Sequence, residues 1–160
     1  MTTCYAAALT VAAGPGAIWR VLIDPALHTR LDASGTVGAP ATGEPLSRVG
    51  QVFTMNMSYD DGDRVTRYRS DNHVSVFEPE RSIAWMTAVV GGPPLGWTWR
   101  YDLNPAGSAT RVTLSYDWGG TSAESIARFA VPNRTPQELH ATLVRLAGLV
   151  DADAAGTSAS

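Results

Sequence analysis

His28 and Asp32 are four residues apart in the segment Pro25-Ala-Leu-His-Thr-Arg-Leu-Asp32. On a helix, residues at this spacing share a face, so the carboxylate could orient the imidazole. Imidazole titrates near neutral pH, so such a pair could act as a general acid and base or bind a ligand by hydrogen bonds. Ser34 lies close behind and could join the pair. The alternative is a local role, in which Asp32 and Ser34 bond to backbone amides at a helix end.

Tyr68, Asn72 and Tyr116 are polar side chains within segments of alternating apolar residues. On a strand, Tyr68 and Asn72 would be about 13 Å apart and would touch different parts of a bound molecule. Asn72 could instead belong to a hydrogen-bond network inside a sheet. The candidate catalytic residues are therefore His28, Asp32, Tyr68 and Tyr116.

The same alternation predicts which side chains point inward. This set mixes methionine, which adapts its shape, with aromatic rings that carry one polar atom, a composition that suits a pocket for a flat or greasy molecule. The alternative is that the rings simply fill the core. The predicted ligand-binding residues are Phe53, Met55, Met57, Tyr68, Asn72, Trp85, Trp97, Trp99, Tyr101, Tyr116 and Trp118.

Several functional classes are disfavoured by composition. All twelve basic residues are scattered arginines and the formal net charge is −3, which argues against nucleic acid as a partner. Neither the three histidines nor the single cysteine has metal-ligand spacing, and no glycine-rich nucleotide motif occurs, so we expect no metal and no cofactor. The lone Cys4, with no evident signal peptide and no membrane span, predicts a cytoplasmic protein.

The elements that must position these residues follow from periodicity. Five segments between Phe53 and Trp118 alternate with a period of two, which predicts an antiparallel sheet with one packed and one wet face. The predicted elements are a strand at 4–13, short helices at 15–23 and 25–31, a loop at 32–50 with an irregular edge strand near Thr36, strands at 53–59, 64–78, 83–87, 97–103 and 111–118, a helix at 121–130, and a helix of about fifteen residues ending near 150.

Two features complete the predicted architecture. Residues 1–150 form one domain, and residues 151–160, which are small and polar, form a flexible tail. The helix that ends near 150 carries one apolar stripe, Leu139, Leu143, Leu146 and Val150, and must pack on the sheet. A helix about 10 Å wide cannot fill the concave face of six or seven strands, so we expect an internal cavity beneath it.

The order and spacing of these segments resemble the START-like (SRPBCC) superfamily, in particular its actinobacterial polyketide cyclase/dehydrase and lipid transport branch. The resemblance spans most of residues 5–150. It implies an α+β helix-grip fold, in which a curved antiparallel sheet of six to seven strands carries two short helices after its first strand and a long C-terminal helix over its concave face. The stretches that match are 18–25, 28–37, 50–57, 72–79, 83–85, 99–103 and 110–118.

Three functions remain open, because this fold hosts unrelated activities. The first is binding of a small hydrophobic or aromatic molecule, lipid- or polyketide-like. The second is a cyclase or dehydratase acting on a polyketide-like substrate, with His28 and Asp32 moving protons. The third is an interaction protein of the chaperone-activator type, which would expose an apolar patch of several hundred Å². The sequence leaves the oligomeric state open.

Overall fold

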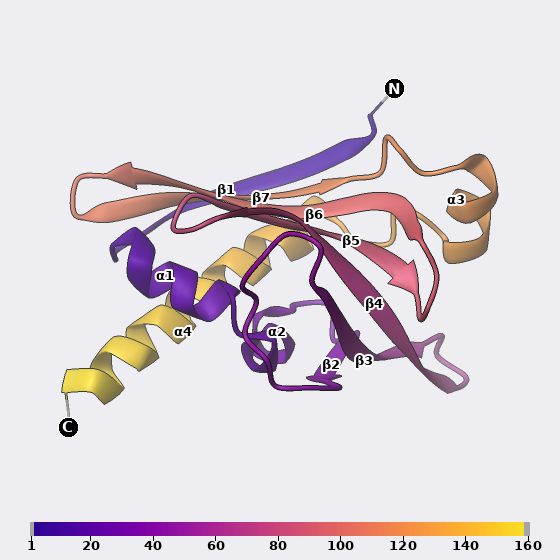
Figure 1. Cartoon of the computed structure of the whole chain (residues 1–160), viewed down its shortest axis with the longest axis horizontal. Coiled ribbons are helices and arrows are strands. Elements are labelled where there is room, and N and C mark those ends of the chain that lie inside the picture. The colour runs from indigo at the N-terminus through magenta and orange to yellow at the C-terminus, as the bar shows by residue number, and fades with distance from the viewer. Residues whose placement is uncertain (1, 159–160) are drawn as a thin grey trace.

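Seven antiparallel strands form one curled sheet, and the main helices lie on its concave side (Figure 1). The computed structural model describes residues 2–158, and side chains as far as Asp153. The sheet order is β1-β7-β6-β5-β4-β3-β2. The elements are β1 (Cys4–Val11), α1 (Pro15–Leu22), α2 (Pro25–Leu31), β2 (Val37–Pro40), β3 (Val52–Asp60), β4 (Val65–Glu78), β5 (Ser82–Val89), β6 (Pro94–Ala106), β7 (Ala109–Asp117), α3 (Ala123–Phe129) and α4 (Pro136–Ser158). This is the predicted α+β helix-grip fold.

The long helix α4 crosses the concave face beneath β1 and β7 (Figure 1). It begins with the expected capping box, in which the amide of Glu138 donates to Thr135 Oγ1 (3.1 Å) and the amide of Thr135 donates to Glu138 Oε1 (3.0 Å). The predicted apolar stripe is buried throughout and packs into the core, with Leu143 and Leu146 fully inaccessible. Burial of this stripe is the main apolar contact between the helix and the sheet.

The C-terminal boundary of α4 differs from the sequence expectation. The predicted flexible tail began at Asp151, whereas the helix continues through Ser158. Alanine occurs three times between 152 and 155, and it is the strongest helix former, which accounts for the extension. Residues 159 and 160 of the predicted tail lie outside the described residues.

The short helices have mostly the expected caps. Asp24 caps α2 by accepting a hydrogen bond from the amide of Ala26 (3.1 Å). For α3, the cap is Ser122, which accepts from the amide of Ser125, whereas the sequence pattern predicts a helix that begins at residue 121. The Thr121 amide donates to the carbonyl of Trp118 in a turn, which delays the start of the helix by one residue.

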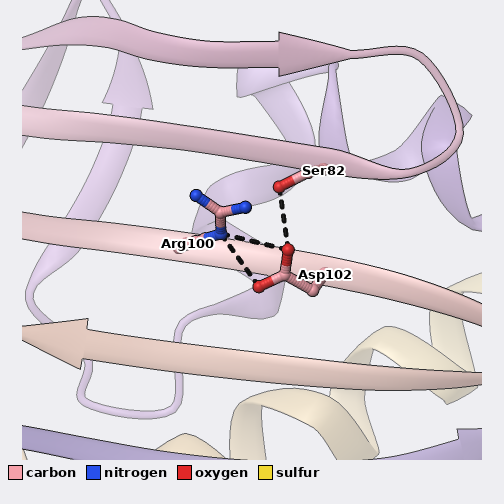
Figure 2. Close-up of polar contacts among 3 residues, drawn as sticks. All are labelled: Ser82, Arg100 and Asp102. Atoms are coloured by element: carbon pink, nitrogen blue, oxygen red, sulfur yellow. Dashed lines mark hydrogen bonds and ion pairs between the residues drawn. The ribbon is translucent and has the colours of Figure 1, made fainter.

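The convex face of the sheet is polar, as the alternation predicts. Figure 2 shows its central cluster, in which Nε of Arg100 lies 3.0 Å from both carboxylate oxygens of Asp102 and Ser82 Oγ donates to the same carboxylate at 2.9 Å. The Arg100 side chain remains 42% exposed, so this ion pair adds little stability. No helix in the described part of the chain is long and apolar enough to cross a membrane.

Candidate functional site

A row of aromatic side chains crosses the concave face over four neighbouring strands. The register places Tyr5 opposite Tyr116, Tyr116 opposite Trp99, and Trp99 opposite Trp85. Trp99 and Tyr116 stack with ring centres 4.2 Å apart and an interplanar angle of 4°. Trp118 extends the row, since its ring lies 4.8 Å from Tyr5 and 5.3 Å from Tyr116. Cross-strand ring pairs of this kind stabilise a sheet and also form a flat apolar surface.

A second ring cluster surrounds His28. Its imidazole stacks on Trp85 at 5.2 Å and meets the edge of Phe53 at 5.7 Å. Nε2 lies 2.8 Å from the carbonyl oxygen of Leu22, which fixes the proton on that nitrogen because a carbonyl can only accept. Burial lowers the pKa of His28, and the Leu22 carbonyl and the charge of Asp24 offset this only in part. His28 is therefore a neutral ring in the core at neutral pH.

Asp32 does not pair with His28, although the spacing allowed it. α2 ends at Leu31, and Asp32 takes an extended conformation (φ −65°, ψ 118°), which takes its side chain out of the helical register. Its carboxylate accepts hydrogen bonds from the amides of Ser34 (3.1 Å), Thr36 (3.0 Å) and Val37 (3.0 Å), and from Ser34 Oγ (2.7 Å). Asp32 and Ser34 therefore have the local role that was the alternative to a His28–Asp32 pair: they bond to backbone amides where the chain turns from α2 into β2.

The burial of His28 predicts a stability that depends on pH. The unfolded chain binds a proton at the ordinary pKa of 6.5, whereas the folded protein stays neutral to lower pH. At pH values between the pKa of His28 in the unfolded chain and its lower pKa in the folded protein, the unfolded state holds more protons. Acidification in this range must therefore lower the free energy of unfolding, by up to about 1.4 kcal/mol per pH unit. Urea unfolding at several pH values just below 6.5 measures this slope.

Two histidine variants isolate the effect. His28→Gln keeps a donor for the Leu22 carbonyl and removes the titrating ring, so the slope should flatten. His140→Gln, at an exposed position on α4, should leave the slope unchanged. An unchanged slope in His28→Gln would contradict the assignment of the pH dependence to this ring.

Asn72 and Tyr101, both predicted as ligand contacts, differ in their hydrogen bonds to the rest of the protein. The Asn72 amide donates to the Phe53 carbonyl (3.4 Å) and accepts from Thr87 Oγ1 (3.2 Å), which is the network alternative. The hydroxyl of Tyr101 has no hydrogen-bond partner among residues 2–158, and burial and the charge of Asp32 raise its pKa.

Tyr68 lies elsewhere than the sequence predicted. It was expected inside, yet 44% of it is exposed. It does share the inward face with Met57, its cross-strand partner, but the β3–β4 hairpin extends beyond the N-terminal start of α4 (Figure 1). Tyr59 (59%) and Val89 (43%) are exposed on the same face. We call this uncovered part of the concave face, Met57, Tyr59, Tyr68 and Val89, the open strip.

The loop of residues 130–135, between α3 and α4, adds polar groups near the open strip. Tyr116 Oη lies 3.3 Å from Asn133 Oδ1, and Arg134 Nη1 donates to the Asn133 carbonyl at 2.8 Å. Burial raises the pKa of both Tyr68 and Tyr116, and the Arg134 charge opposes this at both hydroxyls. Sequence reasoning missed Asn133 and Arg134, because they lie in a short loop where no periodicity marks a side chain as inward.

The other predicted ligand residues lie on the concave side, in one continuous set of ring and thioether contacts. Met57, Trp85 and Trp99 are half-buried and the rest are buried, so much of this face is core packing, which was the alternative weighed from the sequence. A ligand cavity among these rings stays a prediction. The buried members are Phe53, Met55, Asn72, Trp97, Tyr101, Tyr116 and Trp118.

A hollow of about 610 Å³ lies on the other side of the helices. Its walls come from α1, α2, the loop at 43–45 and the last turns of α4 that carry Leu149 and Ala152. It contains none of the predicted site residues.

Comparison with known families gives one match over most of the chain. A family model described as "Activator of Hsp90 ATPase homolog 1-like protein" matches residues 12–151. The uncharacterized protein Rv0088 of Mycobacterium tuberculosis is 29% identical over 116 residues, which cover 71% of this chain and 46% of that protein. The chain thus spans about half the length of the curated relative that it matches.

Solved structures share the fold at low sequence identity. Protein NE0264 from Nitrosomonas europaea superposes with a TM-score of 0.69 at 16% identity, over 96% of this chain and 97% of that one. Protein Ms6760 from Mycobacterium smegmatis gives 0.66 at 17% identity, over 95% and 93%. DynU16, a putative protein in the dynemicin biosynthetic locus, gives 0.61 at 16% identity, over 94% of this chain and 48% of that one.

Proposed function

Since this chain belongs to the family of activator of Hsp90 ATPase homolog 1-like proteins, within the START-like superfamily, we propose that it binds a small hydrophobic or aromatic ligand on the concave face of its sheet. Proteins of this superfamily typically bind hydrophobic ligands. The ligand we propose is lipid- or polyketide-like. The proposal includes a cytoplasmic location, which suits the single, exposed thiol of Cys4.

The main support for the proposal is that the row of aromatic side chains ends in two half-buried rings, Trp99 and Trp85. Trp99 and Trp85 stand side by side on β6 and β5, and both are partly accessible. Along β3, Phe53 and Met55 connect the Trp85 ring with Met57 of the open strip, which α4 leaves uncovered. A flat ligand that enters over Met57 and Tyr68 would gain ring contacts with Trp99 and bury apolar area on both sides.

A fluorescent apolar dye, Nile red, tests the proposal directly, with native mass spectrometry to detect any retained ligand. Tyr68→Ala should weaken dye binding about tenfold, equivalent to about 1.4 kcal/mol, because it removes an accessible ring from the entrance. Its exposure means that the fold should tolerate the change.

The matched control is Arg67→Ala, at the neighbouring position on the opposite face of β4, and it should bind the dye like wild type. If the wild-type protein bound neither Nile red nor any fatty acid, polyketide or naphthol in a displacement screen, the proposal would fail.

Catalysis is a weaker interpretation of the same residues. The polar atoms of three candidate catalytic residues already have protein partners: Nε2 of His28, the carboxylate of Asp32 and the hydroxyl of Tyr116. Acid–base chemistry needs such atoms within reach of a substrate. The geometry therefore favours binding over a cyclase or dehydratase activity. The dynemicin-locus neighbour supports a polyketide-like ligand, though only through a shared fold.

A second candidate is chaperone activation, which the family description names. It would require an apolar surface for the partner. The exposed large apolar side chains are distributed over β3, β4, the end of β5, α4 and the loop before β3. Ligand binding is therefore the function we place first.

A further inference from the structure

We propose that the ligand carries a carboxylate, which Arg134 binds at the entrance to the concave face while the apolar part lies along the open strip and Trp99. This inference deepens the proposed function and rests on it. It identifies the ligand class as an amphipathic carboxylic acid with a flat or greasy body.

Arg134 is held in place by its own loop. Its Nη1 donates to the Asn133 carbonyl (2.8 Å) and approaches Asn133 Oδ1 (3.3 Å). Asn133 is in turn fixed to β7, because its side chain and its amide both contact the hydroxyl of Tyr116. A guanidinium has five N–H donors, and here one nitrogen is engaged by the loop. The rest of the fork stays free for an anion.

No carboxylate of the described residues lies within ion-pairing distance of Arg134. The residue is half-buried, so it has lost part of its hydration without gaining an opposite charge from the protein. A carboxylate is the ion that matches a guanidinium fork, through two parallel charge-assisted hydrogen bonds. The ligand would supply the missing partner.

The position of Arg134 follows from the contacts between its neighbour Asn133 and Tyr116. Tyr68 is on β4 and Tyr116 on β7, and the sheet order places these strands three steps apart, or about 14 Å. Asn133 contacts the Tyr116 hydroxyl and Arg134 donates to the Asn133 carbonyl, so the guanidinium lies beside β7, and its charge also acts on the Tyr68 hydroxyl. Trp99 stacks on Tyr116 with ring centres 4.2 Å apart, so a ring system attached to an anion at Arg134 would lie beside Trp99.

A singly charged group fits better than a phosphate. Glu138 places its own carboxylate at the amide of Thr135, the residue next to Arg134. This negative charge would repel a dianion more strongly than a carboxylate. The formal net charge of −3 also gives no long-range attraction for anions, so the preference must come from Arg134 itself.

Two pairs of matched probes test the inference by displacement of bound Nile red. Naphthoic acid and naphthalenemethanol share a ring system but only the acid is charged at neutral pH, and decanoic acid and decanol form the aliphatic pair. The wild-type protein should prefer the acid over its alcohol about five- to tenfold in the pair that matches the natural ligand class. The pair with the larger preference distinguishes an aromatic acid from a fatty acid.

Arg134→Gln should abolish this preference while the alcohol binds as before. Arg111→Gln removes the same charge from an exposed position on the convex face and should keep the preference. Equal binding of acid and alcohol by wild type, or an intact preference in Arg134→Gln, would overturn the inference and leave the proposed function standing. If no probe of either pair bound, the proposed function and this inference would both fall.

Discussion

Replacement of Trp85 with alanine is expected to lower the free energy of unfolding by about 3–4 kcal/mol. Trp85 contacts three other rings, His28 at 5.2 Å, Phe53 at 5.4 Å and Tyr101 at 6.0 Å, and it is the cross-strand partner of Trp99. Alanine would lose all of these contacts and leave a void between α2 and the sheet. For a chain of this size the melting temperature should fall by roughly 10 °C, measured by circular dichroism.

The control for this prediction is Trp85→Phe, which keeps a ring against His28 and should cost less than half as much. The size of the alanine effect also bears on the cavity predicted from the sequence. A loss below about 1 kcal/mol would mean that Trp85 borders open space rather than packed side chains. That result would contradict the core role and favour a ligand cavity at this position.

Leu143→Ala is expected to cost about 3 kcal/mol of unfolding free energy. Leu143 is 0% exposed and lies at the centre of the apolar stripe of α4. Its removal leaves a cavity between the helix and the sheet that the rigid strands cannot close. Urea denaturation with a linear extrapolation measures the change.

The adjacent residue provides the matched control. Val144 lies about 100° around the helix from Leu143. It is 51% exposed, so Val144→Ala should change stability by less than about 0.5 kcal/mol. If the two substitutions cost the same, the helix would not be held by the stripe, and the packing of α4 on the concave face would need another explanation.

The fold could be predicted because each element carries its own local signal. Residues 53–59 and 111–118 alternate with a period of two, and the stripe Leu139, Leu143, Leu146 and Val150 has the spacing of a helix face. Asp24 and the pair Thr135–Glu138 are capping signals that the structure contains as hydrogen bonds. Such signals depend on neighbours within a few residues, so they can be interpreted without knowledge of the rest of the chain.

The candidate site could be predicted only in part. Which rings face inward follows from the alternation, and it was correct for Phe53, Trp85 and Tyr116. Whether a ring on that face is covered depends on where α4 begins relative to the hairpin, and for this reason Tyr68 was wrongly placed inside. The four-residue spacing of His28 and Asp32 implied a pair only if the helix continued through both, and α2 ends one residue too early.

By itself, the sequence determined the order of strands and helices, the apolar face of each, and the membership of the chain in a superfamily, because all three are carried by local patterns. The tertiary structure alone decided that His28 is a neutral core ring, that Asp32 closes a loop, and that the charge of Arg134 acts on Tyr68. These are relations between residues from 4 to 66 positions apart in the sequence, and only chain folding sets the distances between such groups.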